Sequence, residues 1–431
     1  MLVTLLFLPL SISITTSAMT NPLSKTKLAG ADPIFAVSTA FTESSHPEKI
    51  SVGVGAYRGE TGEPLVMAAV TAAKGRLASQ ISQNWTHEYI PIGGLDLFLG
   101  GARTLLFGKS PSSAVTSIQS LSGTGALRLF ADLAFQNPSF TTIAIPNPTW
   151  GNHKDIFAAA GLKTIGYTYL DPSTPKKPSI DFTKTLSSLS SLPPNTIALF
   201  HLCAHNPSGV DFSKSQWKEL AELCKSNQLF PCFDNAYQGF ATGDLEDDAW
   251  PVRYFVDQKI PLFAACSFAK NMGLYGERIG ALHYSTPGGE DEAAAVLSQL
   301  KLIARRTYSS PPQFGAAVAG LVLSDVELRE MWVSELKEMA ERIKSMRVKL
   351  RGVLEKNGGG GETCRDWSHV TEQIGMFSYT GLREDEVAAC AEQGLFMLKS
   401  GRISLAGVND GNVERVGEVM IGSIEACKKT R

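Results

Sequence analysis

Short apolar runs alternate with helical patterns through the middle of the chain, and this alternation restricts the fold more than any other feature. The apolar runs predict strands at 115–121, 142–145, 162–169, 196–202, 229–234 and 261–267. Helices are predicted between them at 124–135, 152–160, 181–190, 214–227 and 250–257. Alternation of this kind favours a mostly parallel sheet with helices on both faces, so we expect an α/β fold.

The two ends of the chain follow a different pattern. A short strand is predicted at 50–57, a helix at 64–77 and the end of another helix at 104–109. One long helical stretch from 324 to about 356 precedes Gly358–Gly361, which predicts a flexible turn. Strands near 373–379 and 402–406 then indicate a smaller α+β region. We therefore expect an extension at 1–30, an arm and part of the small domain at 31–66, a large domain at 67–339 and a small domain at 340–431.

Composition excludes several classes of function. The chain has 431 residues, enough for two domains, and a formal net charge of −2, which gives no electrostatic case for nucleic acid. Its seven cysteines show no CxxC pair and its seven histidines no HExxH helix. This pattern is typical of reduced intracellular thiols, and we expect neither a disulfide framework nor a metal site.

The first residues suggest a targeting segment only weakly. Residues 1–24 carry no charge, and the apolar run 2–10 before a small-residue segment at 15–18 resembles a secretory signal, which stays an alternative. The basic region of a signal is missing, and the run is too short to span a bilayer. A mitochondrial presequence needs arginines, but the first is Arg58. Since Met19 is a natural start, we expect a cytoplasmic protein with a dispensable extension and no membrane segment.

Lys270 follows a small apolar run at 262–265 and precedes a glycine-containing turn. Desolvation lowers the pKa of a lysine, and a neutral amine is a nucleophile that forms Schiff bases with carbonyl cofactors. The alternative is a lysine that ends a strand with its head in water.

Residues Ser122–Ala126, with the sequence Ser-Gly-Thr-Gly-Ala, lie between a predicted strand and a predicted helix. Glycines allow close approach to a ligand, and the free N–H groups of a helix N-terminus attract an anion such as phosphate. The segment is neither a Walker A loop nor a complete GxGxxG, and an ordinary tight turn is the alternative.

Other polar residues also follow predicted strands, where ligands of open α/β sheets bind. Asn-Pro pairs at 147–148 and 206–207 are typical of turns that hold a cis bond. Trp150 is either a core residue or a stacking platform. Asp234 is either a helix cap or an anion that keeps a heterocyclic nitrogen protonated, and Tyr237 would reach the same ligand.

Three arginines stand in irregular or glycine-containing segments: Arg278, Arg305 and Arg402. A guanidinium binds carboxylates and phosphates through two hydrogen bonds, so these arginines are candidates for anionic ligands. Each could equally be a surface charge.

Several of these residues belong to longer strings that carry a family resemblance. The strings are Val52-Gly-Val-Gly-Ala-Tyr-Arg58, His87-Glu-Tyr-Ile-Pro-Ile-Gly-Gly94, Leu121-Ser-Gly-Thr-Gly-Ala-Leu-Arg128, Asn147-Pro-Thr-Trp-Gly-Asn-His153, Cys203-Ala-His-Asn-Pro-Ser-Gly209, Tyr237-Gln-Gly-Phe240 and Gln373-Ile-Gly-Met-Phe377. From about residue 32 to the C-terminus the chain resembles the aspartate aminotransferases, pyridoxal-phosphate enzymes of fold type I, and this resemblance implies a mostly parallel sheet of the seven-stranded type.

The resemblance implies a role for each site residue. Lys270 would hold pyridoxal 5′-phosphate covalently, Asp234 would pair with its ring nitrogen, and Trp150 would stack on the ring. Tyr237 and Asn206 would bind the ring's phenolic oxygen. The phosphate would be held by Ser122, Gly123, Thr124, Ser267, Arg278 and Tyr89 of a second subunit. Arg402 would bind the substrate α-carboxylate, Arg305 of the second subunit the side-chain carboxylate, and Gly55 would lie against the substrate. His153 and His201 would support the residues that contact the cofactor.

The resemblance also implies a reaction and an assembly. We expect a homodimer with shared active sites that transfers an amino group between L-aspartate and 2-oxoglutarate by a ping-pong mechanism, with dicarboxylate amino and oxo acids as substrates. The chain departs from the family at Asn235, Cys266 and Ala269, which bears on pKa tuning and thiol sensitivity. The alternatives are an aromatic aminotransferase, a pyridoxal-phosphate lyase and a non-catalytic binding protein of the same fold.

Overall fold

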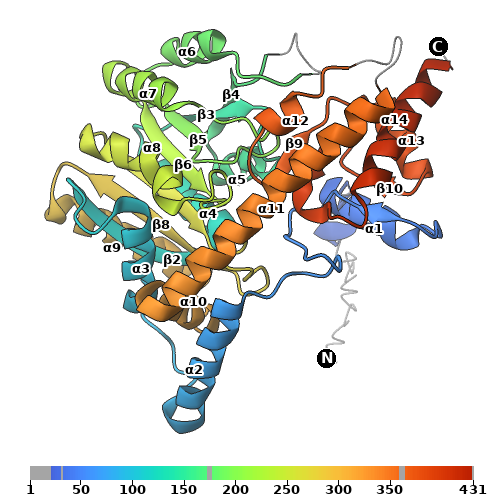
Figure 1. Ribbon diagram of the computed structural model, residues 1–431. Coiled ribbons are helices and arrows are strands. Elements are labelled where there is room, and N and C mark those ends of the chain that lie inside the picture. The colour runs from blue at the N-terminus through green and yellow to red at the C-terminus, as the bar shows by residue number, and fades with distance from the viewer. Residues whose placement is uncertain (1–20, 31–32, 172–176, 359–364, 430–431) are drawn as a thin grey trace, which may run out of the picture.

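The computed structural model describes residues 21–30, 33–171, 177–358 and 365–429, and its centre is a seven-stranded sheet (Figure 1). The sheet order is β2-β8-β7-β6-β5-β3-β4. Its strands are β2 (Ala114–Leu121), β3 (Thr142–Asn147), β4 (Lys163–Thr168), β5 (Ile197–His201), β6 (Phe230–Asn235), β7 (Leu262–Ser267) and β8 (Ile279–Thr286). Strand β8 runs in the opposite direction to all the other strands of this sheet, so the expected α/β fold with a mostly parallel sheet is confirmed.

Helices cover both faces of this sheet, as the alternation predicted. One face packs on α4 (Ser122–Gln136), α5 (Asn152–Ala160) and α9 (Glu290–Thr307) through a buried cluster that includes Ile118, Leu199 and Phe263. The other face packs on α3 (Asp96–Phe107), α6 (Phe182–Ser190), α7 (Lys214–Ser226) and α8 (Leu245–Asp257) through a cluster that includes Phe200 and Phe233. Strands buried on both faces read as continuous apolar runs, which is why the sequence located them well.

The remaining elements form a second region beside the sheet. It contains α1 (Pro33–Glu43), β1 (Ile50–Ser51), α12 (His369–Glu372), β9 (Phe377–Tyr379), α13 (Glu384–Glu392), β10 (Leu395–Phe396), β11 (Arg402–Ser404) and α14 (Val413–Lys429), with short 3-10 turns at Pro22–Lys25 and Leu405–Gly407. Two small sheets, β1-β10 and β11-β9, hold it together. The long helix α11 (Val326–Gly358) runs diagonally across the molecule from α10 (Phe314–Ser324) and α2 (Ala68–Asn84) towards α12 and α14 (Figure 1).

Some predicted boundaries were wrong, for local reasons. The expected strand at 50–57 is only Ile50–Ser51, because its one partner, β10, is a two-residue strand. Helix α8 begins at Leu245 and not near Trp250, because the Asp244 side chain accepts hydrogen bonds from two backbone N–H groups of the first turn and Pro251 lies inside the helix.

Other differences concern whole elements. Helix α2 extends to Asn84, beyond the predicted end at 77, and β8, α9 and α10 were not predicted. The predicted turn at 358–361 lies almost entirely outside the described residues. Within the described ranges, no helix combines the length and apolar character that a membrane span requires.

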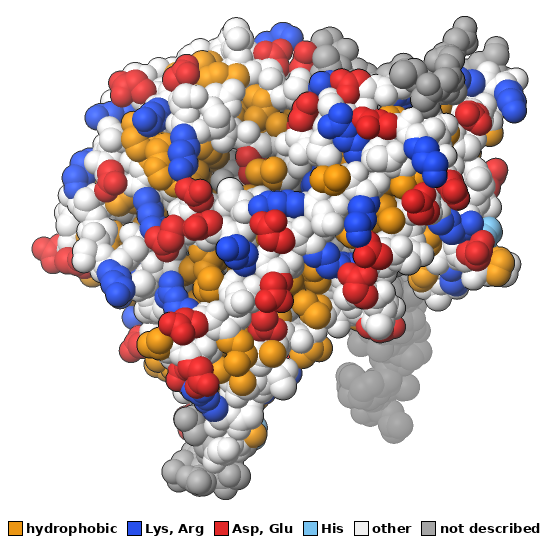
Figure 2. Space-filling view, in the orientation of Figure 1, with side chains coloured by type: hydrophobic (Ala, Val, Ile, Leu, Met, Phe, Trp, Pro, Cys, Tyr) orange, Lys and Arg blue, Asp and Glu red, His pale blue; other side chains and the backbone are white. Residues whose placement is uncertain are grey.

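The surface carries charges of both signs. Figure 2 shows acidic and basic side chains interspersed over the face that contains α11, without an extended area of one sign. This distribution agrees with the formal net charge of −2. Salt bridges on this surface, such as Lys344–Glu341, join partly exposed side chains, so they add little to stability.

Candidate active site

A cavity lies at the carboxyl ends of the central parallel strands, where ligands of open α/β sheets bind. It is lined by Ser122, Gly123, Thr124, Trp150, His201, Asn206, Asp234, Ala236, Tyr237, Ser267, Lys270 and Arg278. The structure therefore brings together all the cofactor residues that were predicted within one chain. They come from the ends of β2, β3, β5, β6 and β7 and from the turn before β8, so the parallel sheet itself assembles the site.

One end of the cavity is built to receive an anion. Helix α4 starts there without a side-chain cap and without an acidic residue in its first turn. The hydroxyl oxygens of Ser122 and Ser267 lie 2.9 Å apart, and a Cβ on Gly123 would lie 3.2 Å from the Ser267 Cβ. Arg278 reaches the same end, where its guanidinium donates to the Tyr275 carbonyl. Free N–H groups, hydroxyls and a guanidinium together suit a phosphate.

Close packing behind this end fixes its shape. A Cβ on Gly280 of β8 would lie 2.5 Å from the Ser122 carbonyl carbon and from the Cys266 carbonyl oxygen. The Ser122 N–H donates to the carbonyl of Arg278, and both residues adopt positive φ values, 61° and 54°. Strand β8, which the sequence did not predict, therefore locks the anion-binding turn against the turn that carries Lys270.

A carboxylate stands at the other end of the cavity. Asp234 is buried, and His153 Nε2 lies 3.0 Å from its Oδ2. Burial alone would raise the pKa of Asp234, but the hydrogen bond and charge of His153, with smaller contributions from His201 and Lys270, lower it below its ordinary value. A permanent anion at this position suits a ligand nitrogen that has to stay protonated.

The Thr149 side chain connects the two histidines near Asp234, His153 and His201. Its hydroxyl lies 2.8 Å from His153 Nδ1 and 2.9 Å from His201 Nε2. Burial and the charge of His153 lower the pKa of His201 to about 3, so His201 is neutral. The sequence suggested His153 and His201 as support for the site. It missed Thr149, although this residue stands inside the Asn-Pro-Thr-Trp string.

Lys270 occupies the wall between these two ends. Burial lowers the pKa of its amine; the nearby Asp234 carboxylate opposes this effect and Arg278 adds to it. The Nζ atom lies 5.2 Å from the centroid of the Tyr237 ring. Burial keeps the pKa of Tyr237 above its ordinary value although the Arg402 charge opposes this, so its hydroxyl is protonated. An amine with a lowered pKa serves as a nucleophile or a base.

Arg402 adjoins the cavity through Asn206. It lies in β11, is 3% exposed, and donates from Nη1 to Asn206 Oδ1 at 3.1 Å and from Nη2 to the Gly53 carbonyl at 2.6 Å. Burial lowers its pKa to about 10, which still leaves it charged at neutral pH. Since a guanidinium has five N–H donors, three remain for another acceptor.

Three predicted residues lie outside the cavity within a single chain. Tyr89 is 83% exposed. Arg305 lies in the last turn of α9, not in an irregular segment as expected, and bonds Ser309 from an exposed position. Gly55 faces the Phe377 ring, since a Cβ there would lie 3.0 Å from its Cζ. The assignment of Tyr89 and Arg305 to a neighbouring subunit stays a prediction.

The departures at Asn235 and Cys266 form one buried pair on the sheet face opposite the cavity. Asn235 Nδ2 lies 3.5 Å from Cys266 Sγ and 2.8 Å from Gln238 Oε1. Burial raises the pKa of Cys266 to about 12, so its thiol stays protonated and unreactive at neutral pH. The expected cis bonds at Asn147–Pro148 and Asn206–Pro207 are both present.

Comparison with known proteins agrees with this geometry. The family described as aminotransferase class I and II matches residues 47–419. Mitochondrial aspartate aminotransferase of Xenopus tropicalis is 44% identical over 395 residues, which span 90% of this chain and 90% of that protein. Cytoplasmic aspartate aminotransferase of Oryza sativa subsp. japonica is 43% identical over 405 residues, 93% of this chain and 97% of that protein.

Two solved structures extend the comparison to the fold. Cytoplasmic aspartate aminotransferase of Saccharomyces cerevisiae superposes with a TM-score of 0.89 at 36% identity, covering 94% of this chain and 99% of that one. Aromatic-amino-acid aminotransferase of Burkholderia pseudomallei, whose structure holds covalently bound pyridoxal phosphate, gives a TM-score of 0.88 at 37% identity over 94% of this chain and all of that one. On its sequence and its fold, the chain belongs to the class I and II aminotransferases.

Proposed function

We propose that the protein is an aspartate aminotransferase that uses pyridoxal 5′-phosphate to transfer the amino group between L-aspartate and 2-oxoglutarate, giving oxaloacetate and L-glutamate. The observation that carries this proposal is the single cavity in which Lys270, Asp234 and the anion-binding end of α4 meet. Each polar group of the cofactor would find a partner there. Relatives that share 43–44% of the sequence and are named aspartate aminotransferases support the choice of substrate.

The residues of the cavity fit the cofactor as follows. Ser122, Gly123, Thr124, Ser267 and Arg278 would hold its phosphate, and Lys270 would bind it covalently. When bound, the cofactor supplies an electron sink for the electron pair left at the substrate Cα. Asp234 would favour this by holding a proton on the ring nitrogen, and the hydrogen bond from His153 lowers the pKa of its carboxyl group and orients it.

Three further residues would orient the ring. Trp150 would stack on it, and Tyr237 and Asn206 would bind its phenolic oxygen. Their fixed positions would set the tilt of the ring relative to the Lys270 amine, which matters for proton transfer.

Lys270 would transfer the proton at the substrate. Burial lowers the pKa of its amine, which favours the neutral form that would take the Cα proton. The same Nζ would then donate this proton to the cofactor. The second half of the reaction repeats these steps in reverse with the oxo acid, which gives ping-pong kinetics.

Substrate selection would rest on two arginines. Arg402 has three free N–H donors beside the cavity and would bind the α-carboxylate. Arg305, exposed at the end of α9, would bind the side-chain carboxylate in the cavity of a second copy, where Tyr89 would contact the phosphate. This arrangement makes a homodimer with shared sites the proposed assembly.

A second candidate function is aromatic transamination, because solved structures of aromatic aminotransferases are as similar as those named for aspartate. Half-reaction rates with aspartate and phenylalanine separate the two functions: kcat/KM for aspartate is expected to exceed that for phenylalanine by at least tenfold, the discrimination that one buried charge contact provides. Release of ammonia in place of an oxo acid would instead indicate a lyase.

We also propose a division of the chain into two domains and a location in the cell. The seven-stranded sheet supports a large cofactor-binding domain at 67–339, and the two small sheets support a small domain built from 31–66 and 340–431. Of the two compartments named for the relatives, mitochondrial and cytoplasmic, we favour the cytoplasm. Localisation of the full chain and of residues 19–431 as fluorescent fusions tests this; import of the full chain into an organelle would contradict it.

A further inference from the structure

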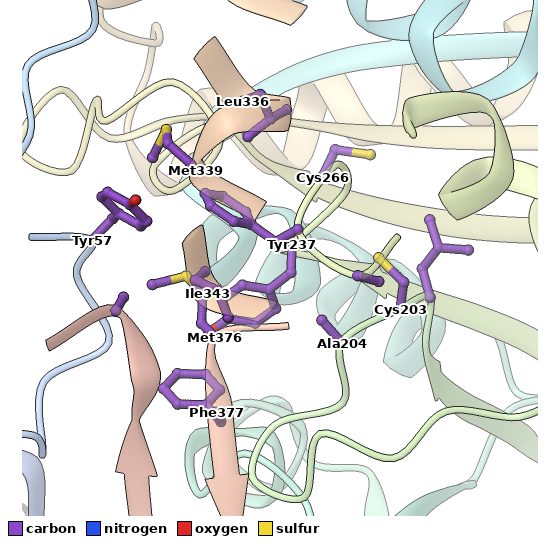
Figure 3. Close-up of a cluster of buried hydrophobic side chains, with 14 of the residues drawn as sticks. Tyr57, Cys203, Ala204, Tyr237, Cys266, Leu336, Met339, Ile343, Met376 and Phe377 are labelled. Atoms are coloured by element: carbon purple, nitrogen blue, oxygen red, sulfur yellow. The ribbon is translucent and has the colours of Figure 1, made fainter. Parts of the chain in front are cut away.

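Phe377 lies directly against the guanidinium of Arg402. It belongs to β9, is 2% exposed, and the Arg402 Cζ lies 4.2 Å from its ring centroid. The Tyr237 ring packs edge-on against the same ring, with centroids 5.5 Å apart and an interplanar angle of 85°. Figure 3 shows Phe377 and Tyr237 in one buried cluster with side chains of α11. One phenyl ring thus contacts two residues of the site without lining the cavity.

The hydrogen bonds of Arg402 leave one motion of its guanidinium open. They fix Nη1 on Asn206 and Nη2 on Gly53, whereas Nε is a buried donor without a partner in the described structure. Two anchored nitrogens define an axis about which the plane can still tilt. A ring against one face of the plane blocks that tilt and adds a cation–π attraction, which is strongest where water is excluded.

The position of Phe377 is itself fixed by contacts of its backbone and of its ring. The Phe377 carbonyl accepts a hydrogen bond from Arg347 Nη2 at 2.6 Å, and a Cβ on Gly209 would lie 2.5 Å from the same oxygen. On the ring side, Gly55 leaves just enough room, since a Cβ there would lie 3.0 Å from Cζ. Phe377 therefore transmits a fixed position from the long helix α11 to Arg402.

We propose that Phe377 is a positioning residue for substrate binding: its ring holds the guanidinium of Arg402 in the orientation that presents its free N–H donors to the α-carboxylate. This inference rests on the proposed function, in which Arg402 binds that group. Because every amino acid substrate has an α-carboxylate, loss of the ring weakens all of them by a similar factor. Loss of Arg305, by contrast, affects only dicarboxylates.

Phe377→Met tests the proposal because it nearly keeps the side-chain volume but removes the aromatic face. Phe396→Met is the matched control, since Phe396 is a buried strand residue whose ring contacts Phe41. With each holoenzyme, the cofactor spectrum is titrated with aspartate and with alanine. Phe377→Met is expected to raise both apparent dissociation constants roughly tenfold and to change the maximal rates by less than about threefold. Phe396→Met is expected to change neither constant.

Calorimetric titration with succinate provides a readout that does not depend on the reaction, and it is expected to show the same loss of affinity. Failure of the proposed function appears in the wild-type protein, which would then not react with aspartate. The inference itself is overturned if Phe377→Met binds succinate with wild-type affinity, or if Phe396→Met weakens binding equally.

Discussion

His153 Nε2 donates a 3.0 Å hydrogen bond to Asp234 Oδ2, and this bond fixes the charge of the carboxylate at the centre of the site. The donor belongs to α5 and the acceptor to β6, so two segments far apart in the sequence define one functional group. Thr149 connects His153 to His201, which itself lines the cavity. The charge of Asp234 therefore depends on His153, a side chain that does not line the cavity.

His153→Ala is expected to weaken cofactor binding and to cost about 1–3 kcal/mol of stability, because it leaves a buried carboxylate without its donor. Since the folded-state pKa of Asp234 is lowered, its contribution to stability is present above its unfolded pKa and is lost as the pH falls through the folded value. The stability of the variant should therefore differ less between acid and neutral pH than the stability of wild type. Urea unfolding at several pH values measures this, with the partly exposed His46→Ala as control.

Lys270→Met is expected to stabilise the cofactor-free protein at neutral pH. Burial lowers the pKa of Lys270, so the folded state is penalised for holding the charged amine below that pKa, and the penalty disappears as the pH rises through the folded value towards the unfolded one. Thermal unfolding of both cofactor-free proteins at pH 7 and at about pH 10 should show the gain shrinking with pH. A variant that is less stable than wild type at pH 7 would contradict this account of Lys270.

Arg347→Met is expected to destabilise the protein by about 3 kcal/mol or more, because its buried guanidinium donates to three carbonyls, those of Val370, Gly375 and Phe377, which would lose their donor together. Equilibrium urea unfolding gives the value. Lys349→Met, on the same helix but at a surface ion pair with Asp410, is the control and should stay within about 0.5 kcal/mol of wild type. Equal effects of the two substitutions would show that the three carbonyl contacts contribute little.

Two inactive variants are expected to complement each other if the sites are shared. In a hybrid of Lys270→Ala and Arg305→Ala chains, one site keeps Lys270 from the second chain and Arg305 from the first. Refolding an equal mixture should restore about a quarter of wild-type aspartate turnover, because half of the dimers are hybrids and each has one intact site.

A mixture of Lys270→Ala with Arg402→Ala is the control for this experiment, since both residues would serve the site of their own chain and no hybrid site is complete. If aspartate turnover is restored in the control mixture, or is not restored in the test mixture, the assignment of Arg305 to the neighbouring subunit is contradicted.

The sequence predicted the centre of the fold well because its strands are buried on both faces and its helices are amphipathic. Strand β8 was missed although it is fully buried, because it follows the Lys270 turn without a helix between and so breaks the alternation on which the prediction relied. The start of α8 was missed because a side-chain cap, not an apolar period, defines it.

Site residues, too, were predicted where sheet topology places them and were missed where a long-range side-chain contact defines their role. Residues that follow parallel strands, such as Asp234 and Lys270, were predicted because sheet topology alone brings them together. Phe377 was part of a recognised string, but its contact with Arg402 depends on the register in which β9 pairs with β11, and no local pattern encodes this long-range pairing. Thr149 was missed for the same reason, since its hydroxyl acts through two histidines from different elements.

The most direct test of the central claim is the visible absorption spectrum of the purified protein before and after addition of L-aspartate. The wild-type protein is expected to show a cofactor band that depends on Lys270, that shifts when aspartate is added and returns when 2-oxoglutarate is supplied, with oxaloacetate and L-glutamate as products. Lys270→Ala should not show this cycle. A wild-type protein whose band is absent, or is left unchanged by aspartate, would contradict the assignment of this cavity as the site of transamination.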